Sequence, residues 1–185
     1  MALRRMDLPT AHAWQRSLAQ NRDSMRLATI SAGAIGDPVL IPWLIDQMTI
    51  PELARVDGEV FTRITGVDIV YEDLDSEWPE GFEAGPTEAP EDENVDMDPD
   101  ENLPWPEPEL INKWWYTHRH ELQPGLRYLI GKPMSFEWLQ DVLRHGLQRQ
   151  RAAAALELAM WQPGQPLFEV RAPGFRQQQL LRVNR

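Results

Sequence analysis

Cysteine is absent from the chain, which excludes disulfides, thiolate nucleophiles and thiolate metal sites. The sequence also lacks any apolar run approaching the roughly 18 residues of a membrane span. Its N-terminus has basic residues but no apolar segment of signal-peptide length. These absences predict a cytoplasmic protein without a membrane segment. With 185 residues, 42% of them hydrophobic, the chain is long enough to bury a substantial core.

Positive charge is missing from one long stretch. No Lys or Arg occurs from Ile64 through Asn112, whereas 16 of the 29 carboxylates lie between Glu72 and Glu109. Without those 16 carboxylates the formal net charge of -11 would be +5, so the acidity is local. The net charge argues against a nucleic-acid partner, because contacts to phosphates need a basic face.

Residues 67–108 form this acidic tract, which is rich in Pro and has neither a helical nor a strand period. A structureless segment of this length inside a compact domain is typically functional or disordered. The tract also carries aromatic and apolar residues that a solvated tail would lack. These are Trp78, Phe82, Met97, Leu103 and Trp105. We therefore predict an ordered excursion held to the helices by its aromatic side chains, with a flexible linker as the alternative.

Residues 1–66, ahead of the tract, show four apolar stripes at helical spacing. They predict helices over 9–20, over 24–35, from Pro38 to about Met48, and from about 51 to Gly66. Gly36 is expected to end the second helix in the left-handed conformation, with Asp37 as the cap and Pro38 as the first position of the third. Thr49 and Glu52 have the spacing of a capping box for the fourth helix.

Residues 109–185 also have a mainly helical pattern. Helices are predicted from Pro108 to His118, from Ser135 to Arg144 and up to Met160, with a short last one in FRQQQLLRV. The run LRYLIG is ambiguous between strand and helix. We expect this region to pack on the same core as residues 1–66. The predicted fold class is all-α, built of helical hairpin repeats that stack into a superhelix, with a long acidic irregular insertion.

A series of motifs carries a resemblance to a known family. They are GDPVLIPWLIDQM, ARVDGEVFTRITGVD, WPEGFEAGP, PEDENVDMDPDENLPWP, RYLIGKP, LRHGLQRQRAAAALELAM and PLFEVRAPGFRQQQLL. In this order they resemble the C-terminal region of an uncharacterised bacterial HEAT-repeat family that is often encoded in type VI secretion clusters. Family members generally carry more repeats ahead of the position of Met1. The resemblance implies a cytoplasmic accessory protein that binds another protein, such as a secretion effector or a spike component.

No catalytic set is visible, because the chain has no Gly-x-Ser-x-Gly motif and no phosphate-binding loop. The ladder Asp92, Asn94, Asp96, Asp98 and Asp100 has the spacing of a hard-cation loop, but it lacks the Gly of an EF-hand. We interpret it as solvated or arginine-paired, with cation binding as the alternative. His118 and His120 lie about 200° apart on a helix and do not converge on one metal ion.

The candidate partner-binding residues lie in the tract and in the helix after it. They are Trp78, Phe82, Trp105, Trp115, Asp96, Asp98 and Asp100. An aromatic residue between prolines and carboxylates either anchors the loop, which is the favoured interpretation, or forms a binding hot spot. Trp14, Trp43, Trp138 and Trp161 lie on apolar stripes and are expected in the core. Arg149 and Arg151 are candidates for neutralising the tract.

The sequence therefore predicts a noncatalytic protein-binding module without a cofactor. An immunity-type inhibitor of a toxin is one alternative. An enzyme on a lyase-like or hydroxylase-like HEAT scaffold is another. The oligomeric state is a separate question, and a homodimer that covers an exposed apolar helix face is one possibility.

Overall fold

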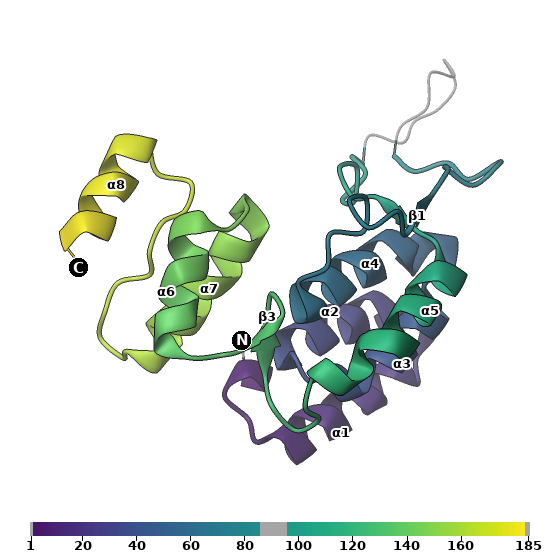
Figure 1. Ribbon diagram of the computed structural model, residues 1–185, viewed down its shortest axis with the longest axis horizontal. Coiled ribbons are helices and arrows are strands. Elements are labelled where there is room, and N and C mark those ends of the chain that lie inside the picture. The colour runs from purple at the N-terminus through teal and green to yellow at the C-terminus, as the bar shows by residue number, and fades with distance from the viewer. Residues whose placement is uncertain (1, 86–95, 184–185) are drawn as a thin grey trace.

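The computed structural model describes residues 2–85 and 96–183, and it is mainly helical (Figure 1). The prediction of a helical protein is therefore confirmed. The α-helices of the described residues are α1 (Leu8–Ala19), α2 (Met25–Ile35), α3 (Ile41–Gln47), α4 (Pro51–Thr65), α5 (Pro108–His118), α6 (Phe136–His145), α7 (Gln148–Trp161) and α8 (Gly174–Val183). Short 3-10 turns cover Ala2–Arg4, Arg22–Ser24, Pro38–Leu40 and Arg119–Glu121.

The strands in the described residues are two antiparallel pairs of two-residue segments. β1 (Asp75–Ser76) pairs with β2 (Trp105–Pro106), so the two ends of the acidic tract lie side by side. β3 (Tyr128–Leu129) pairs with β4 (Lys132–Pro133), which resolves the ambiguous run LRYLIG as a hairpin. Its turn places Gly131 at a positive φ of 75°, which is the conformation that glycine tolerates best.

Side-chain caps start some helices as predicted and not others. Asp7 accepts the Thr10 N–H at α1, and Ser135 accepts the Trp138 N–H at α6. The predicted capping box at α4 is wrong, because the Thr49 hydroxyl donates instead to the carbonyl of Asp46. Helix α4 begins without a side-chain cap, at a proline that has no N–H to satisfy.

The turn Gly36–Asp37–Pro38 joins α2 to α3 through several partners. Gly36 ends α2 with a left-handed φ of 71°, and its carbonyl accepts the Tyr128 N–H of β3 at 2.8 Å. The buried Asp37 carboxylate accepts the N–H groups of Val39 and Gly125, and it lies 2.9 Å from Nε2 of His12. The turn therefore fixes α1, α3 and the β3 hairpin together.

Replacing Gly36 by alanine is expected to destabilise the fold by about 3 kcal/mol. A non-glycine residue in the left-handed region costs roughly 1–2 kcal/mol, and the new Cβ would lie 2.6 Å from the carbonyl oxygen of Tyr128. Gly125→Ala is the matched control, because Gly125 has a φ of 83° but open space around it. Urea unfolding measures the loss of stability in both variants. Gly125→Ala reports the backbone strain alone, and Gly36→Ala reports the strain and the clash. Equal losses of stability would contradict the tight contact with β3.

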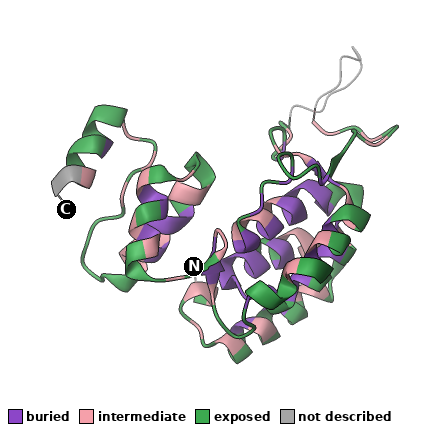
Figure 2. Ribbon diagram, in the orientation of Figure 1, coloured by how far each residue is buried: buried purple, intermediate pink, exposed green. Residues whose placement is uncertain are grey.

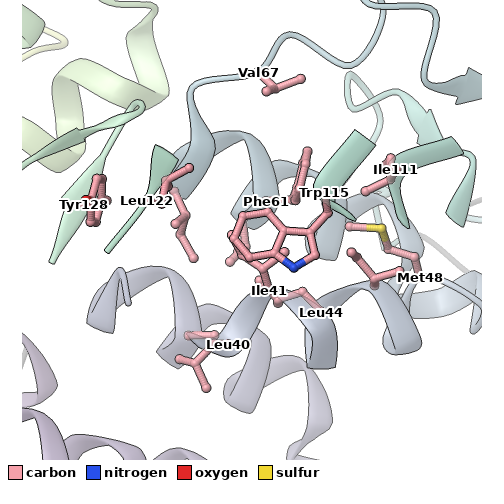
Figure 3. Close-up of a cluster of buried hydrophobic side chains, with 14 of the residues drawn as sticks. Leu40, Ile41, Leu44, Met48, Phe61, Val67, Ile111, Trp115, Leu122 and Tyr128 are labelled. Carbon is pink, nitrogen blue, oxygen red and sulfur yellow. The ribbon is translucent and has the colours of Figure 1, made fainter. Parts of the chain in front are cut away.

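The first hydrophobic core lies within α1 to α5. Helices α2, α3 and α4 surround Ile35, Ile41, Leu44, Phe61 and Ile64, and α5 covers them with Ile111 and Trp115. Figure 3 shows Ile41, Leu44, Phe61, Ile111 and Trp115 converging from α3, α4 and α5, with Leu122 and Tyr128 to one side. This core gives the acidic tract a rigid base, since the tract leaves from α4 and returns at α5.

The C-terminal region divides between this core and a second one, contrary to the expectation of a single core. Helix α5, Leu122 and Tyr128 pack into the first core. Helices α6 and α7 and the end of β3 surround a separate cluster around Leu129, Leu139 and Ala154 (Figure 2). A buried ion pair between Arg4 and Glu157 links the N-terminal turn to α7. The two cores therefore sit next to each other, with polar contacts between them.

Two of the tryptophans expected in the core are largely exposed. Trp14 of α1 is 55% exposed and Trp161 ends α7 at the surface, whereas Trp43 and Trp138 are partly buried. Neither α1 nor the end of α7 is covered by a further layer of the described residues at these positions. A helical stripe predicts a core position only when a second layer covers it.

Candidate functional site

The described parts of the acidic tract, 67–85 and 96–108, are folded against α4. Trp78, Phe82 and Trp105 form an aromatic cluster with ring centroids 5.2–6.0 Å apart. The Trp78 indole N–H donates to the carbonyl of Phe82 at 2.7 Å. The structure thus agrees with an ordered excursion that is held by its aromatic residues, while 86–95 lie outside the described residues.

Arg55 of α4 is the centre of this anchor. Its guanidinium donates to both carboxylate oxygens of Asp98, at 2.7 and 3.0 Å, and to the carbonyl of Asp100 at 2.9 Å. The same group lies 4.9 Å from the Trp78 ring centroid and 5.0 Å from that of Trp105. Arg55 is only 4% exposed. A buried bidentate pair with cation–π contacts on two rings is a strong arrangement for fixing a loop.

Arg26 of α2 makes a second, more exposed contact with the tract. Its guanidinium donates to both carboxylate oxygens of Asp100, at 2.8 and 2.6 Å, and its side chain is 37% exposed. The hydrogen bond from Arg55 is the main cause that lowers the pKa of Asp98. Arg149 and Arg151 were the sequence-based candidates for neutralising the tract, but the ion pairs with Asp98 and Asp100 are made by Arg55 of α4 and Arg26 of α2. Arg151 instead donates to Leu143 and Gln177.

The predicted partner-binding residues fall into two groups. Trp105 and Trp115 are buried, and Asp98 and Asp100 are engaged by arginines, so these four hold the structure rather than face a partner. Trp78 is 48% exposed, Phe82 is half-buried and Asp96 is exposed. The described tract also carries exposed carboxylates and two further exposed apolar or aromatic side chains, Tyr71 and Met97. The carboxylates belong to Glu72, Asp73, Asp75, Glu77, Glu80, Glu83, Asp96 and Glu101.

Beneath the anchor lies a buried acid, Asp57 of α4, that is 0% exposed. Neither of its oxygens has a hydrogen-bond partner among the described residues, and the same holds for the buried hydroxyl of Thr29 on α2. Burial raises the pKa of Asp57 to about 8, although its neighbours Thr29 and Arg26 oppose the rise. A pKa of about 8 means that the protonated form of the carboxyl group predominates at neutral pH.

A cavity of about 450 Å³ lies at the other end of α4. Its walls come from the last turns of α4, the chain at 66–70, the end of the tract at 102–104, the β3–β4 turn and the first turn of α7. Its charged lining residues are Glu59, Arg63, Asp68 and Arg149, and both arginines oppose the rise in the pKa of Glu59 that burial causes. A volume of this size is typical of small-molecule sites.

The histidines occupy structural positions. His12 contacts Asp37, and His118 donates from Nδ1 to the carbonyl of Trp114 and stacks on its ring. Within 2–85 and 96–183, no group of three or more His, Asp or Glu residues is arranged to hold a metal ion. Asp92 and Asn94 of the carboxylate ladder lie outside those ranges. None of the helices in the described part of the chain combines the length and apolar character needed to cross a membrane.

Sequence reasoning missed Arg26, Arg55, Asp57 and the cavity. The signal for Arg55 was present but weak. Helix α4 carries small residues, Ala54 and Gly58, on the side opposite its apolar stripe, and Gly58 lies directly against Pro106 of the tract. Small residues on a second helix face indicate that this face is covered as well. A charged residue on such a face needs a buried partner, and the tract offers the nearest carboxylates.

Comparisons of the chain with models of protein families, with curated proteins and with solved structures found no match.

Proposed function

We propose that the chain is a noncatalytic protein-binding module that presents the outer face of the acidic tract to a basic surface of a partner protein. One observation carries the proposal: Asp98 of the tract is held by the buried Arg55, while Trp78 and many carboxylates of the same tract are exposed. Asp98 and Asp100 are engaged by Arg55 and Arg26. The exposed Glu72, Asp73, Asp75, Glu77, Glu80, Glu83 and Glu101 are the carboxylates that would meet an incoming positive charge.

The physical advantage of this arrangement is that the loop is ordered before the partner arrives. A flexible acidic segment would lose conformational entropy on binding, which lowers affinity. A fixed acidic face accelerates encounter with a basic partner by roughly 10- to 1,000-fold at low ionic strength. An aromatic side chain such as Trp78 at its centre is the residue type that most often dominates binding energy.

The proposed partner is a component of a type VI secretion system, on the basis of the resemblance to HEAT-repeat accessory proteins. The proposal extends to the fold: α1–α2 and α3–α4 are antiparallel hairpins that we assign to HEAT-like repeats, and further repeats would continue them into a superhelix. It places the protein in the cytoplasm, where secretion cargo is loaded. A secretion effector or a spike component is therefore the partner to test first.

Neutralising three exposed carboxylates of the tract is expected to slow the association with this partner. The tract variant is Glu72→Gln, Glu77→Gln, Glu80→Gln, and the control with the same net charge is Glu52→Gln, Glu121→Gln, Glu137→Gln, whose sites are also exposed. The tagged wild-type chain is used to capture proteins from its native cells. The association rate of the captured partner is then measured with all three proteins at low and moderate salt.

We expect the tract variant to associate at least about tenfold more slowly than wild type at low salt, and the control variant to match wild type within about twofold. The wild-type rate should fall steeply as salt rises, because screening shortens the range of the attraction. Equal rates for the two variants, or a rate that ignores salt, would show that the tract is not the docking element.

A further inference from the structure

Trp78 of the acidic tract is held in a fixed place with part of its ring facing solvent. Its indole N–H donates to the carbonyl of Phe82 at 2.7 Å, and its ring packs edge-to-face against Trp105 with the centroids 5.2 Å apart. The guanidinium carbon of Arg55 lies over the ring, 4.9 Å from its centroid. Trp78 is nevertheless 48% exposed. Because Arg55 covers one face of the indole, the exposed part of the side chain includes the opposite face.

The covered face of Trp78 shows which cation this ring already accepts. Arg55 combines cation–π contacts on the rings of Trp78 and Trp105 with a bidentate ion pair to Asp98. A guanidinium group is suited to both contacts at once, because it stacks flat on a ring while its N–H groups donate in the plane to a carboxylate. The pair with Asp98 also offsets the positive charge of Arg55. A second cation on the exposed face therefore meets little repulsion from the first.

The chain on either side of Trp78 supplies carboxylates for such a cation. Residues 67–85 contain seven carboxylates and no Lys or Arg, and all seven carboxylates are exposed. None of them forms an ion pair with a residue in 2–85 or 96–183. Glu77 directly precedes Trp78, and Glu80 follows it by two residues. Charge complementarity therefore favours a cationic side chain as the occupant of the exposed indole face.

We propose that the exposed face of Trp78 binds an arginine side chain of the partner protein, with the guanidinium stacked on the indole and its N–H groups donating to the flanking carboxylates. This assignment, which rests on the proposed function, names the side chain that the tract recognises. Arginine fits better than lysine, because an ammonium group is compact and strongly hydrated and has no plane to stack on a ring. The contact repeats on the second face of the indole the arrangement that Arg55 makes on the first.

Three peptides that differ in one type of side chain provide the probe. Each has the sequence Gly-X-Gly-X-Gly-X-Gly with blocked ends, where X is arginine, lysine or citrulline. Citrulline has nearly the shape of arginine but carries no charge. Each peptide is titrated into the full chain at low salt, and the indole N–H signal of Trp78 is followed by NMR. The signal that is missing from the spectrum of Trp78→Phe identifies this indole.

We expect the arginine peptide to shift the Trp78 indole signal and to bind at least about threefold more tightly than the lysine peptide. The citrulline peptide should bind at least about tenfold more weakly than the arginine peptide, since both the cation–π attraction and the ion pairs need the charge. A nuclear Overhauser effect between the Trp78 ring and the arginine side chain shows the stacking without any substitution. Equal binding of the arginine and lysine peptides, or no binding of the arginine peptide, would overturn the proposal.

Trp78→Leu removes the ring but keeps an apolar side chain. It should weaken binding of the arginine peptide at least about threefold. Trp14→Leu is the control, because Trp14 is a tryptophan of α1 outside the tract that is 55% exposed, and it should leave the affinity unchanged. Exchange at the amide of Leu103, which donates to the carbonyl of Asp100 at 2.9 Å, checks that the tract stays folded. An unchanged affinity in Trp78→Leu would contradict the stacking, and the wild-type Overhauser effect decides the matter if exchange at Leu103 rises.

The captured partner separates the arginine site from the proposed function. Its association rate is measured with Trp78→Leu and with the tract variant Glu72→Gln, Glu77→Gln, Glu80→Gln. If the arginine peptide binds independently of Trp78 while the tract variant still associates slowly with the partner, the acidic docking face stands and the arginine site is wrong. If the tract variant associates as fast as wild type, the proposed function is wrong, whatever the peptides show.

Discussion

Replacing Arg55 by methionine is expected to release the acidic tract from α4 and to lower the free energy of unfolding by about 3 kcal/mol. Methionine keeps an apolar stem of similar length in the buried site but removes the bonds to Asp98 and to the carbonyl of Asp100. It also removes the cation from between Trp78 and Trp105. Because Asp98 can return to water when the tract detaches, the loss should lie near the lower end of the range for breaking a buried pair.

Arg26→Met is the matched control for this variant. Both substitutions remove one positive charge and one bidentate contact to the tract, but the Arg26 side chain is 37% exposed and that of Arg55 is 4% exposed. Exposed ion pairs contribute about 0–1 kcal/mol, since solvent screens them. The two variants therefore differ mainly in the burial of the broken pair.

Hydrogen exchange measures the release directly. The amide of Asp100 donates to the Asp98 carboxylate, and that of Leu103 donates to the Asp100 carbonyl, both at 2.9 Å. Exchange at these two amides should rise by roughly 100-fold in Arg55→Met and by no more than about tenfold in Arg26→Met. Similar exchange in the two variants would show that the buried pair is not what orders the tract.

The same pair of variants tests whether partner binding depends on order or on charge alone. Every exposed carboxylate of the tract is retained in both, and their net charges are equal. If preordering matters, Arg55→Met should lose partner affinity while Arg26→Met keeps most of it. Equal affinities would assign the binding to the acidic composition and not to the shape of the loop.

The local signals in the sequence were sufficient for the helices and for one turn. Gly36 and Gly66 end α2 and α4 in the left-handed conformation, and Ser135 caps α6, as their residue types indicate. These features depend on interactions within a few residues. The capping box at Thr49 failed because α4 begins at Pro51 with Ile50 as its N-cap, so Thr49 lies one residue too early.

The anchor of the tract could not be read from the sequence in the same way. Asp98 lies 43 residues from Arg55, and Asp100 lies 74 residues from Arg26. Any of the chain's arginines was electrostatically suitable, and only the packing of α2 against α4 brings these two next to the tract. The cavity has the same origin, because its lining residues from α4, the tract and α7 come together only once the two cores are placed.

Asp57→Asn is expected to stabilise the protein at neutral pH and to have almost no effect near pH 4. The folded-state pKa of Asp57 is raised from 3.8 to about 8 by burial. Between these two values the folded chain holds a proton that the unfolded chain has released. The contribution of Asp57 to stability therefore falls by about 1.4 kcal/mol per pH unit as the pH rises through this window, and it is constant above it.

Asparagine resembles the protonated acid in shape and in hydrogen-bonding capacity, and it does not ionise in the unfolded chain. At pH 7 the substitution should raise the free energy of unfolding by on the order of 4 kcal/mol, since about three pH units separate the unfolded pKa from this pH. Asp46→Asn, at an exposed position of α3, is the control. It should change stability by less than about 0.5 kcal/mol at every pH.

Urea unfolding of wild type, Asp57→Asn and Asp46→Asn between pH 4 and pH 8 provides the measurement. The quantity of interest is the difference between each variant and wild type, because the other titrating groups cancel in it. If the difference in the free energy of unfolding between variant and wild type grows with pH for Asp57→Asn alone, Asp57 is a buried protonated acid. If this difference in free energy is the same at every pH, Asp57 is ionised in the folded chain. Arg26 is the cation that opposes the rise in its pKa. Arg26 would then be shared between Asp57 and Asp100. Its ion pair with Asp100 would be weaker than the short distances between the two groups indicate.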